Sequence, residues 1–383
     1  MNSFENLKIP EFQKRESPKT QGEQEEDEDF ELQEALQEAY RDSKFFGMLN
    51  TQKEKGDSPT ALFTDIDNTF SRADRVEATK ELERKSEEEN IPIISVTGNS
   101  FEGVLKRIER GELPYFSVIA GSVGTEIWLL HETPEGEKEK EYKKEYKKDT
   151  FFEKKLRESG FKRGEIAAKG SQMVADLRRV HPEWGIDFQQ PGKERELLEK
   201  ADPEYQPFKV SFYFYASPGS VEEVAKEVAT RFPSQSLVVC EEINYNRRLP
   251  SDAPMRKYCL DILPISKGET VAYLSKLAGI KQGIVAGDSG NDTDMLLETG
   301  SLNAVLVGGY KPEAKEAVDK AVDKAVIKRK LGKRSFQKIT SPEGKVKAIY
   351  IEQDPARLGP ESILRAAEIL QRAANIKKIR KNL

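Results

Sequence analysis

The sequence predicts an α/β protein built on a doubly wound parallel sheet, because short apolar segments alternate with helix-forming segments. The first apolar segments lie at residues 61–64, 91–96 and 116–120. Residues 283–286 and 304–307 repeat the pattern later in the chain. Such alternation is typical of a parallel sheet with helices on its faces, so we expect all five segments to be strands of one sheet.

The segments between these strands have the composition and the periodicity of helices. Residues 77–89 are polar but rich in helix-forming residues. Phe101, Leu105 and Ile108 recur at helical spacing after Ser100, a residue type that caps helix N-termini. A strand, a helix and the next strand therefore follow one another twice before residue 121.

The middle of the chain departs from this order and predicts an inserted α+β domain. Residues 208–215 alternate as a strand does, residues 221–232 have helical periodicity, and residues 236–243 form another strand pattern. The lysine- and glutamate-rich run at residues 137–148 is typical of a solvated face. We therefore expect a cap domain inserted into the α/β core.

The N-terminal region has a composition of its own. Acidic residues cluster at residues 23–31, and few aliphatic residues precede Leu32, so we expect a largely disordered, solvated tail whose partner, if any, is unknown. A short helix at residues 30–46 remains an alternative, docked through Phe45, Phe46 and Met48. The predicted organisation is a tail at residues 1–58, a core at residues 59–130 and 264–383, and a cap at residues 131–263.

Composition excludes several classes of function. The 62 Lys and Arg residues against 67 Asp and Glu residues give a net charge of −5, which argues against a nucleic acid partner. We find no apolar run near the ~20 residues of a membrane helix, and no secretory signal in the first ten residues. Cys240 and Cys259 are the two cysteines, so a disulfide framework is not expected and a cytoplasmic location is.

Two loops carry paired carboxylates directly after predicted strands. Asp65 and Asp67 lie in residues 64–69 (TDIDNT), and burying them there is costly unless a cation or a reaction uses them. Asp288 and Asp292 lie in residues 286–292 (AGDSGND), where they offer the oxygen ligands that Mg²⁺ prefers. A calcium-binding EF-hand is the rival interpretation of the second loop, but its spacing and terminal glutamate are missing.

Two further loops are suited to binding phosphate. Thr97 and Gly98 end the second predicted strand, and Lys267 opens the helix at residues 271–277. A hydroxyl and exposed amides at such a turn can hold phosphate oxygens, and a lysine adds a full positive charge. Carboxylates that merely capped helices would leave the order of these four loops unexplained.

The four loops, in this order, resemble the motifs of the haloacid dehalogenase superfamily of phosphatases. Residues 122–127, 209–212 and 261–264 further resemble the sucrose-phosphate phosphatase group, which carries a type IIB cap between the second and third motifs. The resemblance covers about residues 60–370. It implies a haloacid dehalogenase-like core and a phosphatase that uses Mg²⁺ to hydrolyse a sugar phosphate, such as sucrose 6-phosphate or a related disaccharide phosphate.

The resemblance also implies roles for single residues. Asp65 is the expected nucleophile, which forms an aspartyl-phosphate, and Asp67 the expected general acid and base. The expected phosphate-binding residues are Thr97, Gly98, Lys267 and Asn291, of which Thr97 and Lys267 are also expected to be catalytic. The expected ligands of Mg²⁺ are Asp65, Asp288, Asp292 and a backbone oxygen of Asp67.

The second motif departs from the pattern of these enzymes. Asn99 stands where they usually have arginine after Thr-Gly. Another phosphoryl-transfer enzyme, such as a phosphomutase or a phosphatase of a different small metabolite, therefore remains an alternative. A non-catalytic phosphatase-like binding module is a third hypothesis, although such a module would have no use for both Asp65 and Asp67.

Overall fold

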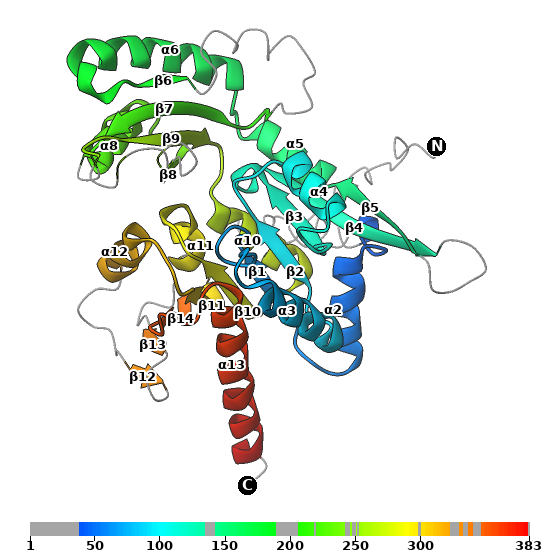
Figure 1. Ribbon diagram of the computed structural model, residues 1–383. Helices are drawn as coiled ribbons and strands as arrows, with labels where there is room; N and C mark the ends of the chain where they lie inside the picture. Colours follow the sequence, from blue (N-terminus) through cyan, green and yellow to red (C-terminus); the bar gives the residue numbers. More distant parts are fainter. Residues whose placement is uncertain are drawn as a thin grey trace, which may run out of the picture.

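The computed structural model describes residues 38–134, 142–188, 206–217, 220–241, 246, 250, 253–297, 300–321, 329–331, 336–339 and 346–381. Within these residues the chain forms a large sheet, a smaller sheet and the helices that cover them (Figure 1). The smaller sheet and its helices lie above the large sheet in the view of Figure 1.

The large sheet contains the five strands that the sequence predicts. Its strand order is β12 (Arg329–Leu331), β13 (Phe336–Ile339), β14 (Val346–Glu352), β11 (Gly300–Leu306), β10 (Gln282–Gly287), β1 (Thr60–Thr64), β2 (Ile93–Val96), β3 (Val118–Gly121), β4 (Glu126–Pro134) and β5 (Tyr142–Lys148). The strands from β14 to β3 run parallel, and the outer strands on both sides are antiparallel. The predicted α/β fold class is confirmed.

Successive side chains of the central strands point to opposite faces, and each face has its own helices. Leu62 of β1 packs in a cluster with residues of α3 (Val76–Glu89), α4 (Phe101–Glu109) and α13 (Pro360–Lys381). Its neighbour Phe63 packs on the other face with residues of α2 (Lys44–Glu54) and α10 (Lys267–Ala278). The short helix α11 (Thr293–Leu297) and α12 (Pro312–Ala321) cover the β11 and β14 end. The core is therefore wound on both faces.

The smaller sheet is antiparallel, in the order β6 (Asp187–Phe188), β7 (Val210–Ala216), β9 (Arg256–Leu263) and β8 (Ser236–Glu241). The helices of this unit are α6 (Arg163–Val180) and α8 (Val221–Arg231), whereas α5 (Thr150–Glu158) packs against β4 of the large sheet. Phe212 and Phe214 of β7 are buried in the same apolar cluster as Leu177 of α6 and Val228 of α8. One face of this sheet is thus covered by helices.

The opposite face of the smaller sheet is turned toward the core. Val238 of β8 and Leu263 of β9 form a small buried cluster with Val123, which lies in the loop after β3. Asp261 is the register partner of Val238 and therefore shares its face. Polar residues on this face are accordingly directed toward the loops of the core.

The hairpin of β4 and β5 lies in the large sheet, which differs from the expected limit of the core at residue 130. Strand β4 continues across that residue to Pro134 because β5 pairs with it along its length. The hydroxyl of Tyr146 on β5 also donates a hydrogen bond of 2.9 Å to the backbone oxygen of Phe116. We propose that the cap begins after the next helix, α5, and ends with β9. As expected, most side chains of β5 are exposed.

The N-terminal expectation is wrong for the residues of α2. Phe45, Phe46 and Leu49 are buried against the sheet, and Gln52 exchanges hydrogen bonds with the backbone of Thr60 at the start of β1. The averaged composition of residues 1–58 concealed this short apolar segment. The predicted docking through Phe45, Phe46 and Met48 is confirmed, and the helix that carries these residues, α2, begins at Lys44. Residues 1–37 lie outside the described residues.

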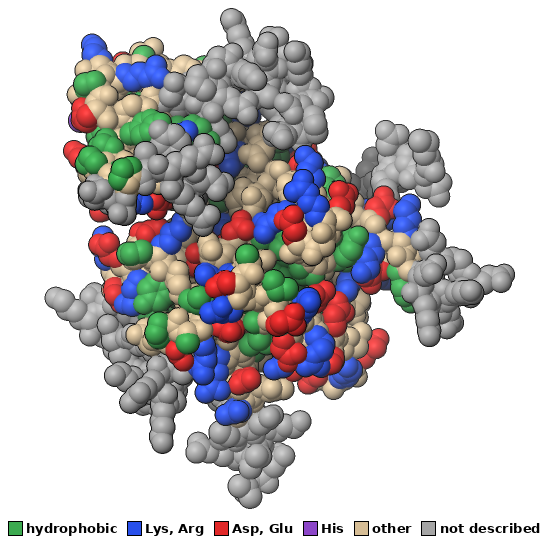
Figure 2. All heavy atoms as spheres, in the orientation of Figure 1, with side chains coloured by type: hydrophobic (Ala, Val, Ile, Leu, Met, Phe, Trp, Pro, Cys, Tyr) green, Lys and Arg blue, Asp and Glu red, His purple; other side chains and the backbone are tan. Residues whose placement is uncertain are grey.

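No helix among the described residues combines the length and the apolar character that crossing a membrane requires. On the face of the molecule drawn in Figure 2, basic and acidic side chains are interspersed over the core.

Candidate active site

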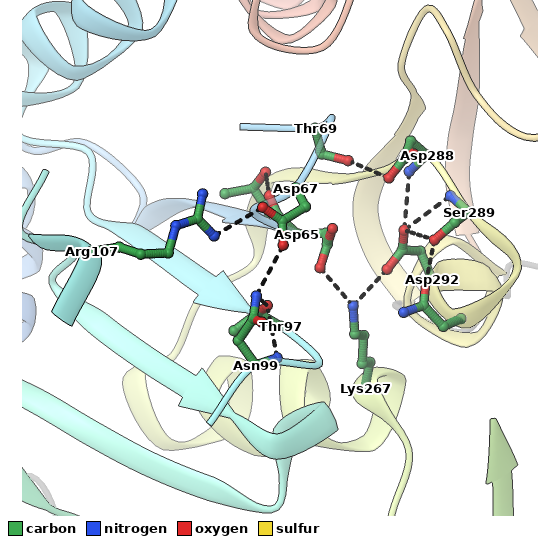
Figure 3. Close-up of polar contacts among 12 residues, drawn as sticks. Asp65, Asp67, Thr69, Thr97, Asn99, Arg107, Lys267, Asp288, Ser289 and Asp292 are labelled. Atoms are coloured by element: carbon green, nitrogen blue, oxygen red, sulfur yellow. Dashed lines mark hydrogen bonds and ion pairs between the residues drawn. The ribbon is translucent and has the colours of Figure 1, made fainter. Parts of the chain in front are cut away.

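Three adjacent parallel strands bring the predicted motifs together at one edge of the large sheet. Asp65 follows β1, Thr97 follows its neighbour β2, and Asp288 follows β10 on the other side of β1. The carboxyl ends of these strands meet at the same edge, which is where ligands bind in open α/β sheets. Lys267 enters the site as the first residue of α10 (Figure 3).

Lys267 connects the first and last motifs. Its ammonium group donates to Asp65 Oδ1 at 2.9 Å and to Asp292 Oδ1 at 2.7 Å. The lysine side chain is fully buried, and the capping box of Ser266 and Glu269 fixes the start of its helix. The cation is therefore held rigidly between two carboxylates that lie far apart in the sequence.

The glycine-rich loop after β10 holds Asp292 in place. Asp292 Oδ2 accepts hydrogen bonds from the backbone N–H groups of Asp288 and Ser289, at 3.0 and 3.1 Å, and from the Ser289 hydroxyl at 3.2 Å. A Cβ atom at Gly287 would lie only 2.4 Å from the Cβ of Asp292, so no larger residue fits there without displacing it. Asp288 in turn accepts a 3.0 Å hydrogen bond from the Thr69 hydroxyl.

Asp65, Asp288 and Asp292 form a buried carboxylate cluster in which one oxygen of each lies within 4.8 Å of the others. Burial and the neighbouring acids raise the pKa of Asp65 to about 7 and that of Asp288 to about 8. Burial alone would lower the pKa of Lys267, but Asp292 and Asp65 raise it overall. With the lysine charged and all three acids ionised, the net charge is −2, which suits one divalent cation.

The hydrogen bonds indicate which oxygens are left for that cation. Both oxygens of Asp292 accept hydrogen bonds, whereas Asp65 Oδ2 and Asp288 Oδ2 have no donor among the described residues. Hard carboxylate oxygens are the ligands that Mg²⁺ prefers. The donor set therefore fits Mg²⁺, which Asp65 and Asp288 would hold, while Asp292 holds the lysine and the loop.

Asp67 lies on the opposite side of Asp65, and its carboxylate is not part of this cluster (Figure 3). Its Oδ2 accepts from the Asn99 amide at 3.0 Å, and its Oδ1 accepts from Arg107 Nη1 at 2.9 Å. The side chain is 55% exposed, in contrast to the buried cluster. A role of Asp67 in metal binding would thus fall to its backbone oxygen, as the sequence analysis expects.

Thr97 is buried beside Asn99. Its hydroxyl oxygen accepts hydrogen bonds from the backbone N–H and the side-chain amide of Asn99, both at 3.2 Å. Its backbone oxygen accepts from Val123 N at 2.8 Å. Val123 has a φ of 64°, a strained value for a β-branched residue, and it packs against the cap. The second motif is therefore in contact with both Asp67 and the cap sheet.

The two other predicted residues lie next to these groups. Gly98 is half-buried between Thr97 and Asn99, and Asn291 is half-buried with its Oδ1 accepting from the Ser289 hydroxyl. The sequence analysis missed Thr69, Ser289 and Arg107. The first two lie inside recognised motifs, but nothing local distinguishes Arg107 from Lys106 on the same helix or from Arg110 directly after it.

Comparison with known proteins identifies the family. The family model for sucrose-6F-phosphate phosphohydrolase matches residues 58–163 and 186–330, which is more than half of the chain. The chain belongs to this family. The resemblance drawn from its motifs is confirmed, and the protein is a haloacid dehalogenase-type sugar-phosphate phosphatase, a phosphoric monoester hydrolase.

Two individual relatives match the chain at low sequence identity. Kanosamine-6-phosphate phosphatase of Bacillus subtilis (strain 168) is 28% identical over 272 residues, covering 66% of this chain and 84% of the relative. Probable sucrose-phosphatase 2 of Arabidopsis thaliana is 33% identical over 138 residues, covering 33% of this chain and 30% of that protein.

A solved structure shares the fold. The sucrose-phosphatase of Synechocystis sp. PCC6803, in complex with sucrose and phosphate, superposes with a TM-score of 0.53 at 20% identity. The match covers 82% of this chain and 98% of that one.

Proposed function

We propose that this enzyme uses Mg²⁺ to hydrolyse the 6-phosphate of a sugar, with sucrose-6F-phosphate or a related disaccharide phosphate as its substrate. The observation that carries the proposal is the buried group of Asp65, Lys267, Asp288 and Asp292, assembled at the edge of the sheet that faces the cap. Buried carboxylates at this density are costly to fold and are useful in a site that handles phosphate.

The reaction proceeds in two steps on the chain's own residues. The Asp65 carboxylate attacks phosphorus, the bond from phosphorus to the sugar oxygen breaks, and Asp67 gives its proton to the departing oxygen. Water then attacks the phosphorus of the aspartyl-phosphate while Asp67 takes a proton from it, the bond from phosphorus to the Asp65 oxygen breaks, and inorganic phosphate leaves with the Asp65 carboxylate restored. Lys267 and Thr97 stabilise the phosphate oxygens, with Gly98 and Asn291 as further contacts.

Asp65, Asp288 and the backbone oxygen of Asp67 would hold Mg²⁺, and Asp292 would orient this group. The bound ion supplies positive charge that lets the anionic nucleophile approach the anionic phosphate. Lys267 cannot supply this charge alone, because it is already paired with two carboxylates.

The substrate assignment rests on the family and on the cap. The names of the family and of the kanosamine-6-phosphate relative share one chemical feature, a phosphate on carbon 6 of a hexose. On the cap face turned toward the core, Asp261 accepts from the Ser211 hydroxyl at 2.6 Å and pairs with Lys209 at 3.0 Å. Polar groups built into this sheet support recognition of sugar hydroxyls.

The test is a phosphate-release assay over a panel of substrates. We expect sucrose-6F-phosphate to exceed glycerol phosphate and p-nitrophenyl phosphate in kcat/KM by at least ~10-fold, because each unpaired buried polar group costs about 1–3 kcal/mol. The Asp65→Asn variant provides the background. A preference for a phosphate without a sugar would refute the proposal.

A hexose 6-phosphate is the second candidate, because the Bacillus subtilis relative is matched over most of its length. Kanosamine 6-phosphate and glucose 6-phosphate therefore belong in the same panel. A higher kcat/KM for either of them than for sucrose-6F-phosphate would assign the enzyme to monosaccharides and leave its chemistry unchanged.

A further inference from the structure

Arg107 makes a contact that the motifs of the family do not account for. Its Nη1 lies 2.9 Å from Asp67 Oδ1, although forty residues and a complete strand separate the two in the sequence. Asn99 holds the other carboxylate oxygen at 3.0 Å. The exposed side chain of Asp67 is therefore held from two sides (Figure 3).

Both holding groups are themselves fixed. The Asn99 amide also donates to the buried Thr97 hydroxyl at 3.2 Å. Arg107 projects from α4, whose Val104 and Ile108 are buried under the sheet and whose N-terminus is capped by Ser100. A helix anchored in this way can fix the direction of a side chain that it carries.

The guanidinium has a second partner that restrains it from the far side. Arg107 Nε lies 3.6 Å from Glu112 Oε2, and the arginine side chain is only 26% exposed. Asp67 is therefore at the end of a chain of charged contacts that begins outside the site. Asn99 alone would leave one of its oxygens to water.

We propose that Arg107 is a positioning residue for the reaction, which orients Asp67 toward the oxygen of the leaving sugar. The inference rests on the proposed role of Asp67 as the proton donor. A donor must lie within hydrogen-bond reach of the atom it protonates, and the Asp67 side chain is 55% exposed, so packing does not enforce this position. The guanidinium enters from α4, while Asn99 occupies the position where an arginine would follow Thr97-Gly98.

Comparing substrates with different leaving groups distinguishes a positioning role of Arg107 from a merely structural one. A sugar alkoxide needs a proton as it leaves, whereas p-nitrophenolate is stable as an anion and needs none. The ratio kcat/KM includes only the steps up to departure of the leaving group, so the later hydrolysis of the aspartyl-phosphate does not enter it. Misplacing Asp67 should therefore slow the sugar phosphate selectively.

The experiment measures kcat/KM for the best sugar phosphate of the panel and for p-nitrophenyl phosphate. We expect Arg107→Ala to lower the value for the sugar phosphate by ~30-fold or more, mostly through kcat, and the value for p-nitrophenyl phosphate by less than ~3-fold. Arg107→Lys should be intermediate, because lysine keeps the charge without the planar fork. Adding Asn99→Arg to Arg107→Ala should restore part of the lost rate.

Arg110→Ala is the matched control, because Arg110 follows the same helix and approaches the same Glu112 without contacting Asp67. It should leave both rates unchanged. Thermal unfolding of each variant checks the fold, and Arg107→Gln, which keeps part of the side-chain volume without the charge, replaces the alanine variant if that one is unstable. Equal losses on both substrates, or a loss confined to KM, would overturn the inference.

Asp67→Asn distinguishes failure of this inference from failure of the role proposed for Asp67 as the proton donor, whereas a parent enzyme that hydrolyses no sugar phosphate of the panel would refute the proposed function. If that variant hydrolyses the sugar phosphate at the parent rate, Asp67 is not the proton donor and both statements are wrong. If Asp67→Asn is slow while Arg107→Ala is as fast as the parent enzyme, only the positioning role of Arg107 is wrong.

Discussion

Replacing Asp288 with asparagine should stabilise the protein when divalent cations are removed. Burial raises the pKa of Asp288 to about 8 and that of Asp65 to about 7, from an ordinary value of 3.8 for an aspartate. At pH values between 3.8 and these raised pKa values, the two carboxyl groups are protonated in the folded protein and ionised in the unfolded chain. Stability therefore falls as the pH rises from about 4 to about 7, because the folded state binds more protons than the unfolded state.

The magnitude follows from the same shifts. One group contributes about 1.4 kcal/mol per pH unit while it is protonated only in the folded state. For Asp288, the interval from 3.8 to neutral pH corresponds to about 4 kcal/mol. Asparagine has the shape of the neutral acid and does not titrate, so this part of the pH dependence should disappear in the variant.

Urea unfolding in the presence of a chelator, at several pH values from about 5 to 8, measures this difference. We expect Asp288→Asn to exceed the parent by about 1–2 kcal/mol at pH 5 and by about 4 kcal/mol near neutral pH. Millimolar Mg²⁺ should reverse the order, because the ion stabilises the parent and has lost a ligand in the variant. Parallel stability curves in chelator, or equal stabilisation of both proteins by Mg²⁺, would refute the reasoning.

Other substitutions test the nucleophile, the N-terminal helix and the loop after β10. Asp65→Asn should lower phosphate release at least ~1,000-fold, because the amide is a poor nucleophile, with an unchanged circular dichroism spectrum. A chain that begins at Asp57 should have a free energy of unfolding several kcal/mol lower than a chain that begins at Glu38. Each buried Phe or Leu side chain of α2 contributes about 1.5–3 kcal/mol to this free energy. Gly287→Ala should displace Asp292 and abolish stabilisation by Mg²⁺ in a thermal melt, and an unchanged melt would contradict the close packing of that loop.

The central parallel strands of the large sheet could be predicted from the sequence because a strand that is buried on both faces consists of a continuous run of apolar residues. The same reasoning located most of the carboxylates, since a polar group directly after such a strand lies at the edge where the strands end. Asp65, Thr97 and Asp288 all follow this rule. Each of these predictions needed only the residues on either side of a strand end.

The features that could not be predicted depend on contacts across the fold. Arg107 reaches Asp67 from a helix that is separated from it by strand β2, and its sequence neighbours are ordinary surface charges. The place of α2 depends on the apolar side chains of a segment whose surroundings are acidic, so composition averaged over residues 1–58 conceals it. The extent of the β4 and β5 hairpin depends on pairing, which periodicity alone does not reveal.

The N-terminal segment lies before the residues that the family model matches, yet it is attached at the junction of core and cap. Asp149, the residue between β5 and α5, is buried and caps α5 by accepting from Phe152 N at 2.8 Å. The same carboxylate accepts from the Tyr40 hydroxyl at 2.7 Å and from the Tyr273 hydroxyl at 3.0 Å. Tyr273 lies on α10, the helix that begins with Lys267. The Asp149 carboxylate thus connects the N-terminal segment, α5 and the helix that carries the buried lysine. The N-terminal segment therefore contributes to the junction between the core sheet and the cap.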